Sequence, residues 1–263
     1  PPQVHFFSDY ATNAYDTFKR IFDACEADAD CHKRYPDIEN TLYQVVDDLD
    51  ANPRTIKYSG TGTQITLTYD GTVFVDALYL FPYLAEPGVV PFVIQSASQG
   101  DFSPIEPLIP FTMGVSPSDT IADGAQNSIL CREETPFDSY ARLVELGRLL
   151  PPQIAQAYDS SAMYDLCAEW GVDPADASEK EPVVSDIPTL ILTGEYDPIT
   201  PPAWAHLASE TLRNSYYYEF PGLGHGVMRS NRCGFQIGLQ FLTDPYTEPN
   251  ASCIDELPGI VFE

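Results

Sequence analysis

The first fifty residues show the spacing of amphipathic helices. From Asp9 to Glu26 apolar and aromatic side chains recur at steps of three and four residues, and residues 37–49 repeat the pattern. Such steps place the apolar side chains on one face of each segment, so we expect two helices. Asn52-Pro53 follows the second segment and predicts its end.

Between Thr55 and Val75 the spacing changes to alternation. Apolar and aromatic side chains stand at every second position from Ile65 to Tyr69, directly before Asp70-Gly71, a dipeptide common in tight turns. Valines at residues 73 and 75 continue the alternation after it. The pattern predicts a short β-hairpin that turns at Asp70-Gly71.

The middle of the chain predicts short helices packed as a cover. Residues 76–113 are rich in aromatic residues, proline and glycine, and their aromatic side chains either form an ordinary core or face a substrate. Residues 127–131 form a short run that we expect to be buried. Residues 137–158 predict a helix that Pro151-Pro152 breaks or kinks. The side chains expected inside that helix are Tyr140, Leu143, Val144, Leu146 and Leu149.

From Pro182 onward strands and helices alternate, which is typical of α/β folds. The pattern predicts strands at residues 189–193 and 216–220 and helices near residues 203–212 and 228–242. Two parallel strands alone would leave both faces of a sheet uncovered, so we expect further strands elsewhere. The predicted fold class is therefore α/β.

Charge narrows the class of protein further. The 263 residues carry a formal net charge of −26, which opposes binding to nucleic acid and to anionic lipid surfaces. The sequence contains no apolar run long enough to span a membrane. Its first residues lack the apolar core of a signal peptide, so we expect an export signal to have been removed or to lie upstream.

Six cysteines predict three disulfides and therefore an oxidising compartment, outside the cell or in a periplasm. The residues by themselves leave the pairing open. Their spacing is not that of a zinc site, and we expect neither a metal nor a cofactor. The six are Cys25, Cys31, Cys131, Cys167, Cys233 and Cys253.

Two polar residues follow the two predicted strands. Asp197 lies in a Gly/Asp/Pro loop after residues 189–193, and His225 lies between glycines after residues 216–220. The carboxyl ends of parallel strands gather catalytic groups, and a carboxylate there can orient an imidazole. Considered alone, Asp197 could equally belong to a turn or cap a helix, and His225 could equally have a structural role. As a pair they predict the acid and base of a catalytic triad.

The order Asp then His, late in the chain, is that of α/β-hydrolases, whose nucleophile comes earlier in a G-x-S-x-G motif. This motif is absent from the sequence. The nearest strings, Gly114-Val115-Ser116-Pro117 and Gly100-Asp101-Phe102-Ser103, lack the second glycine and follow no clear strand. We therefore expect the nucleophile outside this chain, which would leave the isolated chain inactive.

A more specific likeness rests on four strings. The loop Gly194-Glu-Tyr-Asp-Pro-Ile-Thr-Pro201 after a strand, followed by Gly222-Leu-Gly-His-Gly226, resembles the C-terminal region of tripeptidyl aminopeptidase-like hydrolases, relatives of proline iminopeptidase. Cys131-x-Glu133 before Pro136-Phe137 and Cys167-Ala-Glu-Trp170 are similar to that family as well. So is the placement of the other cysteines, with Cys25 and Cys31 near the ends of short lid helices and Cys233 and Cys253 on either side of the final helix. The resemblance covers nearly the whole chain.

This resemblance implies the C-terminal portion of an α/β-hydrolase fold. The missing strands, the nucleophile and the oxyanion-hole loop would precede Pro1, in an N-terminal half that is the partner of this chain. Residues 1–180 would be a mainly helical lid, and residues 181–263 the α/β-hydrolase segment with Asp197 and His225. The implied disulfides join Cys25 to Cys31, Cys131 to Cys167 and Cys233 to Cys253.

The same resemblance implies that lid carboxylates bind the free α-amino group of a short peptide, with Glu133 or Glu134 in that place. The leading hypothesis is a secreted serine peptidase that acts on free N-termini. An esterase or amidase on small substrates is the first alternative, because fold and triad do not set the acyl group. A hydrolase-like binding module without a nucleophile is the second.

Overall fold

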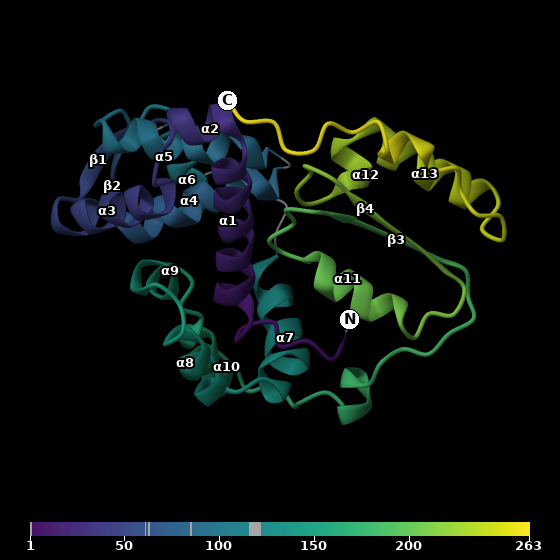
Figure 1. The fold of residues 1–263 in the computed structure, drawn as a ribbon. Helices are drawn as coiled ribbons and strands as arrows, with labels where there is room; N and C mark the ends of the chain where they lie inside the picture. The colour runs from purple at the N-terminus through teal and green to yellow at the C-terminus, as the bar shows by residue number, and fades with distance from the viewer. Residues whose placement is uncertain (1, 61, 63, 85, 116–121) are drawn as a thin grey trace.

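The computed structural model of the chain describes residues 2–60, 62, 64–84, 86–115 and 122–263. Ser116 and Pro117 of the nearest nucleophile-like string lie outside these residues. An N-terminal helical part packs beside a C-terminal part in which helices flank two parallel strands (Figure 1). The C-terminal tail returns from the second part to the first, and ends beside α2 (Figure 1).

Three helices begin the helical part and contribute to its core together with later helices, and both predicted helices are confirmed. They are α1 (Tyr10–Ala27), α2 (Ala29–Arg34) and α3 (Ile38–Ala51). Phe18, Ile21 and Leu42 are fully buried between them, as the spacing of apolar residues predicts. The disulfide between Cys25 and Cys31 joins α1 to α2.

The hairpin is present, but its predicted turn is wrong. Strand β1 (Arg54–Tyr58) pairs antiparallel with β2 (Ile65–Tyr69), so the turn lies between these two strands. Asp70 instead begins helix α4 (Gly71–Tyr83), because its carboxylate accepts a hydrogen bond from the Val73 amide at 3.1 Å. An aspartate that follows a strand is common both at the start of a helix and in a tight turn, so the sequence alone does not distinguish the two.

The aromatic segment forms short helices, as predicted. After α4 come η1 (Pro87–Val89), α5 (Val90–Ser98) and α6 (Ile109–Thr112). Helix α4 is the central element, since eight of its residues are buried and it contacts α3, α5, α6 and α9. Its last turn contains Pro82 and reaches toward the C-terminal part.

The next helices are less buried than predicted. They are α7 (Asp123–Glu133), η2 (Thr135–Phe137), α8 (Tyr140–Gly147), α9 (Pro152–Ala157) and α10 (Ser161–Trp170). The expected buried run at 127–131 is a helix in which only Cys131 is buried, and Ile129 is 53% exposed. Of the five side chains expected inside 137–158 only Leu143 is buried, and Leu149 is 77% exposed.

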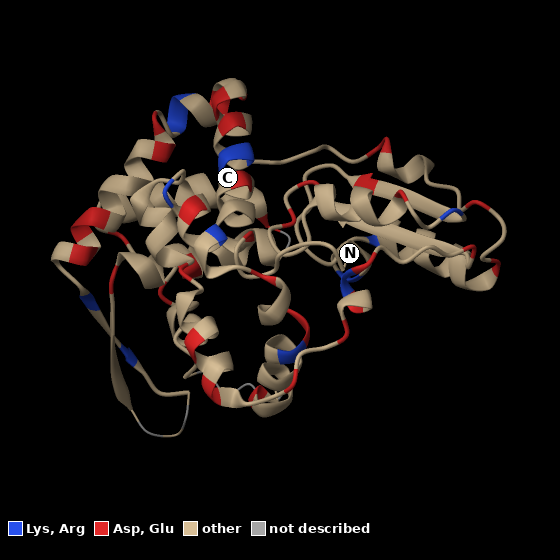
Figure 2. Ribbon diagram, turned by 90° about the horizontal axis from the view of Figure 1, so that it is seen from below, with Lys and Arg blue, Asp and Glu red and all other residues tan. Residues whose placement is uncertain are grey.

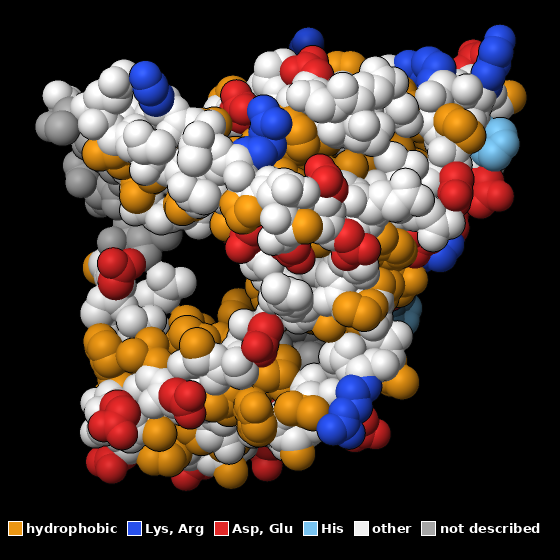
Figure 3. Space-filling view, turned by 90° about the vertical axis from the view of Figure 1, so that its left-hand side faces the viewer, with side chains coloured by type: hydrophobic (Ala, Val, Ile, Leu, Met, Phe, Trp, Pro, Cys, Tyr) orange, Lys and Arg blue, Asp and Glu red, His pale blue; other side chains and the backbone are white. Residues whose placement is uncertain are grey.

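The cause of this difference is visible on the face that carries α8 and α9. In the space-filling view a hollow separates the upper part of this face from the lower part, and hydrophobic side chains gather below the hollow (Figure 3). Apolar spacing predicts which side of a helix is apolar. It does not predict whether another element covers that side.

The C-terminal part has the predicted order of elements. After η3 (Ala177–Lys180) come β3 (Thr189–Gly194), α11 (Pro202–Ser209), β4 (Ser215–Phe220), α12 (Val227–Ser230), α13 (Arg232–Thr243) and η4 (Ser252–Ile254). Strands β3 and β4 are parallel, and within the residues that the structure describes they form a two-stranded sheet. Helices α12 and α13 replace one predicted helix, because Asn231 is extended and its side chain caps α13 through the amides of Cys233 and Gly234.

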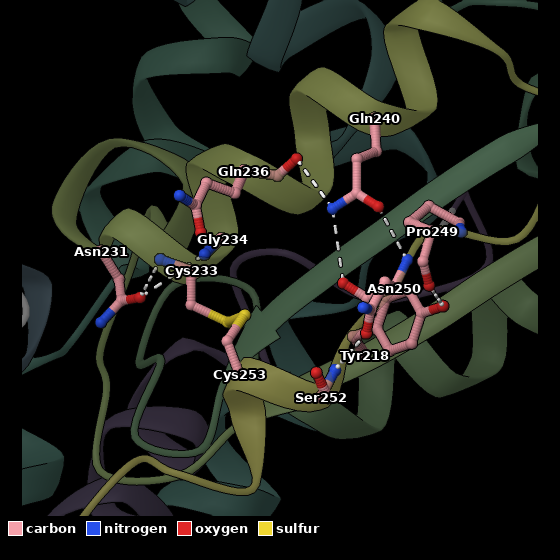
Figure 4. The surroundings of a disulfide bond; sticks show 10 residues. All are labelled: Tyr218, Asn231, Cys233, Gly234, Gln236, Gln240, Pro249, Asn250, Ser252 and Cys253. Carbon is pink, nitrogen blue, oxygen red and sulfur yellow. Dashed lines mark hydrogen bonds between the residues drawn. A yellow bond between two sulfur atoms is a disulfide. The ribbon is translucent and has the colours of Figure 1, made fainter.

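The segment after α13 is attached to the rest of the molecule in two places, by a disulfide with hydrogen bonds to α13 and by a hydrogen bond to Tyr35. The disulfide between Cys233 and Cys253 and the side chain of Gln240, which bonds to the backbone of Asn250, hold the segment after α13 against that helix (Figure 4). Further on, the Tyr35 hydroxyl donates to the Glu263 carbonyl at 2.6 Å. The tail therefore links the α/β part to the helical part.

Acidic side chains are distributed over both parts, and basic ones are few (Figure 2). Across the described ranges we find no helix that is both long enough and apolar enough to cross a membrane. The same residues contain no group of three His, Cys, Asp or Glu side chains arranged to hold a metal ion.

Candidate active site

The site is built where two parallel strands end. In the register of the sheet Gly194, the last residue of β3, lies opposite Phe220, the last residue of β4. The loops that follow therefore leave the same edge side by side. Asp197 stands in the first loop and His225 in the second.

Gly194 allows the two loops to approach closely. A side-chain carbon at this position would lie 2.1 Å from the Gly224 carbonyl oxygen and 2.5 Å from that of Leu223. The loops are also bonded to each other, because the Tyr196 amide donates to the Leu223 carbonyl at 2.8 Å. The Gly222 amide donates to the carboxylate of Glu195, also at 2.8 Å.

Asp197 and His225 meet directly. The Nδ1 atom of His225 lies 2.9 Å from Oδ2 and 3.1 Å from Oδ1 of Asp197. Because a carboxylate only accepts hydrogen bonds, this geometry assigns the proton to Nδ1 and leaves Nε2 as the free, basic nitrogen. The structure thus brings together the two residues that the sequence paired.

The Asp197 carboxylate is buried, with 3% of its residue surface exposed, yet it is fully bonded. Its Oδ1 accepts from the amides of Ile199 and Thr200, both at 2.9 Å. Its Oδ2 accepts from the Thr200 hydroxyl at 2.9 Å. These donors fix the position of the carboxylate, so that it can orient the imidazole of His225.

The last turns of α4 are hydrogen-bonded to the loop of Asp197 and to the loop of His225. The Tyr79 hydroxyl donates to the Pro198 carbonyl at 3.1 Å, next to Asp197. Burial raises the pKa of Tyr79 far above its usual value, so this hydroxyl stays a neutral donor. The backbone amide of His225 donates to the Pro82 carbonyl at 3.0 Å. The Tyr83 ring lies nearly parallel to the imidazole, with centroids 5.4 Å apart and 14° between the planes.

The sequence alone does not assign these α4 residues to the site. For residues 76–113 the sequence predicts only a cover of short helices, whose aromatic side chains either form an ordinary core or face a substrate. Tyr79 and Tyr83 stand four residues apart, which puts them on one face of a helix, and this spacing was the signal available. Thr200 was also missed, although it lies within the Asp197 loop.

Glu133 and Glu134 lie at the end of α7 and differ in their bonding partners. Lys180 forms an ion pair with Glu134 at 2.6 Å, and both side chains are largely buried. For Glu133, which is partly buried, the described residues provide no side-chain hydrogen bond or ion pair. Among the same residues neither glutamate is bonded to Asp197 or His225. The Cys131–Cys167 disulfide fixes this end of α7 to α10.

A buried carboxylate that orients a partly exposed imidazole, at the carboxyl edge of two parallel strands, is the arrangement in which α/β-hydrolases hold the acid and base of their triad. Residues 153–253 match the family model described as TAP-like protein. The resemblance to the C-terminal part of tripeptidyl aminopeptidase-like hydrolases is thereby confirmed over a stretch that contains Asp197 and His225. Glu133 and Glu134 precede it. Comparison with curated proteins and with solved structures gave no match.

Proposed function

We propose that this chain is the C-terminal part of a secreted serine peptidase that cleaves residues or short peptides from free N-termini. The observation that carries the proposal is the bond between Asp197 and His225, with Nε2 of the imidazole left free. The match of residues 153–253 to TAP-like proteins supports the aminopeptidase class. Three disulfides support an oxidising compartment.

In the proposed mechanism His225 is first a base and then an acid. Its Nε2 takes the proton of a serine hydroxyl as the serine oxygen attacks the carbonyl carbon of the scissile peptide bond. The same proton passes to the leaving amine as the C–N bond breaks, which leaves an acyl-enzyme. Water, deprotonated by His225, then releases the acyl group and the serine regains a proton. Asp197 keeps Nδ1 protonated throughout and stabilises the imidazolium.

The serine is proposed to lie in a segment outside residues 1–263. The sequence contains no G-x-S-x-G motif. An apolar groove of about 470 Å³ also lies between β3 and the helices α12 and α13, lined by Leu190, Leu192 and residues of both helices. An N-terminal half that completes the sheet would cover this groove, with residues 1–180 as a lid inserted into the sheet domain.

The nucleophile can be located by covalent labelling of the complete polypeptide that contains this chain. A fluorophosphonate forms a phosphonate ester with an activated serine oxygen and releases fluoride. We expect the label on one serine outside residues 1–263, found by peptide mass spectrometry, and no label in His225→Ala. A label on a serine within the chain would refute the proposed location. No labelling at all would favour the binding-module hypothesis.

Glu133 is proposed to bind the α-ammonium group of the substrate. It is partly buried and has no bonded partner in the described structure, whereas Lys180 already neutralises Glu134. A carboxylate held at the end of a disulfide-linked helix is suited to a charge-assisted hydrogen bond. Such a bond contributes about 1.5–3 kcal/mol. An esterase would instead require an apolar lining at this place.

The change Glu133→Gln is therefore expected to lower kcat/KM on peptides with a free N-terminus about ten- to a hundredfold. N-acetylated peptides or simple esters should react at nearly the wild-type rate, because they present no ammonium group. Glu134→Gln is the matched control, and it should leave the preference for a free N-terminus intact. Equal losses on free and acetylated substrates would remove Glu133 from the site and favour the esterase alternative.

A further inference from the structure

The last turn of helix α4 places the aromatic ring of Tyr83 against the imidazole of His225, the proposed base. The Tyr83 ring and the His225 imidazole lie nearly parallel, at 5.4 Å and 14°. The carbonyl of the adjacent Pro82 accepts a hydrogen bond from the backbone amide of His225 at 3.0 Å, so the backbones that carry the two rings are joined directly. Tyr79, one helical turn earlier, is bonded to the loop of Asp197.

The stacking supplies a restraint that the bond to Asp197 does not. The contacts of Nδ1 with the Asp197 carboxylate fix where that atom lies, but they let the imidazole plane tilt about the line that joins the two groups. A flat aromatic ring parallel to the imidazole opposes this tilt, since the tilted ring would collide with it or lose contact. The direction of Nε2 then becomes fixed, and with it the line along which a proton is exchanged.

The aromatic face also has an electrostatic effect. When the base takes up a proton the imidazole becomes a cation, and the negative face of an aromatic ring within about 6 Å attracts a cation. This attraction is present only when His225 is charged, as it is in the transition state of acyl transfer. It comes from the ring and does not require the hydroxyl group, for which the described residues provide no hydrogen-bond partner.

We propose that Tyr83 is a positioning residue for His225, which acts through its aromatic face by holding the imidazole plane and stabilising the imidazolium. The proposal rests on the proposed function of His225 as the base. It extends the active site to the lid, because the last turn of α4 would have to stay in place for the base to be oriented. Tyr83→Phe should retain this effect, and Tyr83→Leu should lose it.

The stacking is tested without catalysis by NMR of the complete polypeptide with ¹³C-labelled histidine. A parallel aromatic ring shifts the imidazole C–H resonances upfield, and the spectrum of His225→Ala identifies which signals belong to His225. We expect the upfield shift in the wild type and in Tyr83→Phe, and its loss in Tyr83→Leu. Tyr246→Leu, which removes a tyrosine 79% exposed in the C-terminal part, should change nothing. Unchanged resonances in Tyr83→Leu would overturn the stacking.

The effect on catalysis is tested by steady-state kinetics of the same variants. Tyr83→Leu should lower kcat about five- to thirtyfold with KM nearly unchanged, and Tyr83→Phe should restore kcat to within about twofold of the wild type. A raised KM with normal kcat would show instead that Tyr83 binds the substrate. An equal loss in Tyr83→Phe would show that the hydroxyl is the active group. Full activity of His225→Ala would refute the proposed function itself, whatever the NMR result.

Discussion

Replacing His225 with alanine is expected to abolish turnover of the complete enzyme, and Asp197→Asn is expected to lower kcat by up to about 10⁴. The second effect follows from the bonds around Asp197. An asparagine side chain would present an NH₂ group either to the backbone amides of residues 199 and 200, which are themselves donors, or to Nδ1 of His225. Facing Nδ1, it would favour the tautomer that carries the proton on Nε2, which cannot act as a base.

The measurement is kcat and KM on a peptide with a free N-terminus, with the variants shown to be folded by circular dichroism. Asp186→Asn is the control, because Asp186 is exposed and forms an ion pair with Arg213 in the same part of the molecule. It should keep nearly full activity. If His225→Ala or Asp197→Asn retained a near-normal kcat, the assignment of base and acid would be wrong.

A second large effect is expected from one methyl group at Gly194. In Gly194→Ala the new carbon would lie 2.1 Å from the Gly224 carbonyl oxygen, which is backbone and cannot move away by itself. The loops of Asp197 and His225 would have to separate, at a cost of about 1–3 kcal/mol or more in the free energy of unfolding. Because the triad pair spans these loops, kcat should fall together with stability.

Gly124→Ala is the matched control for this substitution. Gly124 lies in α7, and a side-chain carbon there would meet no atom within 4 Å. Alanine has the higher helix propensity, so stability should rise by up to about 1 kcal/mol with no change in kcat. The two variants are compared by urea unfolding and by kcat. Equal stability of Gly194→Ala and the wild type would mean that the loops do not meet as the structure has them.

The local pattern predicted the elements that carry the chemistry. Residues 189–193 and 216–220 are short runs rich in aliphatic, β-branched and aromatic side chains and are bounded by turn residues, a composition that favours strands. Parallel strands that are consecutive in sequence end at the same edge, so the meeting of Asp197 and His225 followed from chain order alone. The first two helices were predicted for the same local reason.

Predictions failed where a residue has two local uses or where burial depends on distant elements. Asp70 fits both a turn and a helix cap, and the helical spacing of the apolar residues after it decided for the cap. Helix α8 has an apolar side, yet Tyr140 and Leu149 are exposed. Whether an apolar side is covered depends on elements that local periodicity does not describe.

By itself the sequence determined the two strands, the placement of Asp197 and His225 after them, and the absence of a G-x-S-x-G motif, because each of these depends on a few neighbouring residues. Only the tertiary structure decided that the end of α4 holds both loops. The contact between Tyr83 and His225 joins residues more than a hundred positions apart, and such contacts depend on how whole helices pack. Tertiary packing also decides the different surroundings of Glu133 and Glu134, because it brings Lys180, which is distant in sequence, into an ion pair with Glu134.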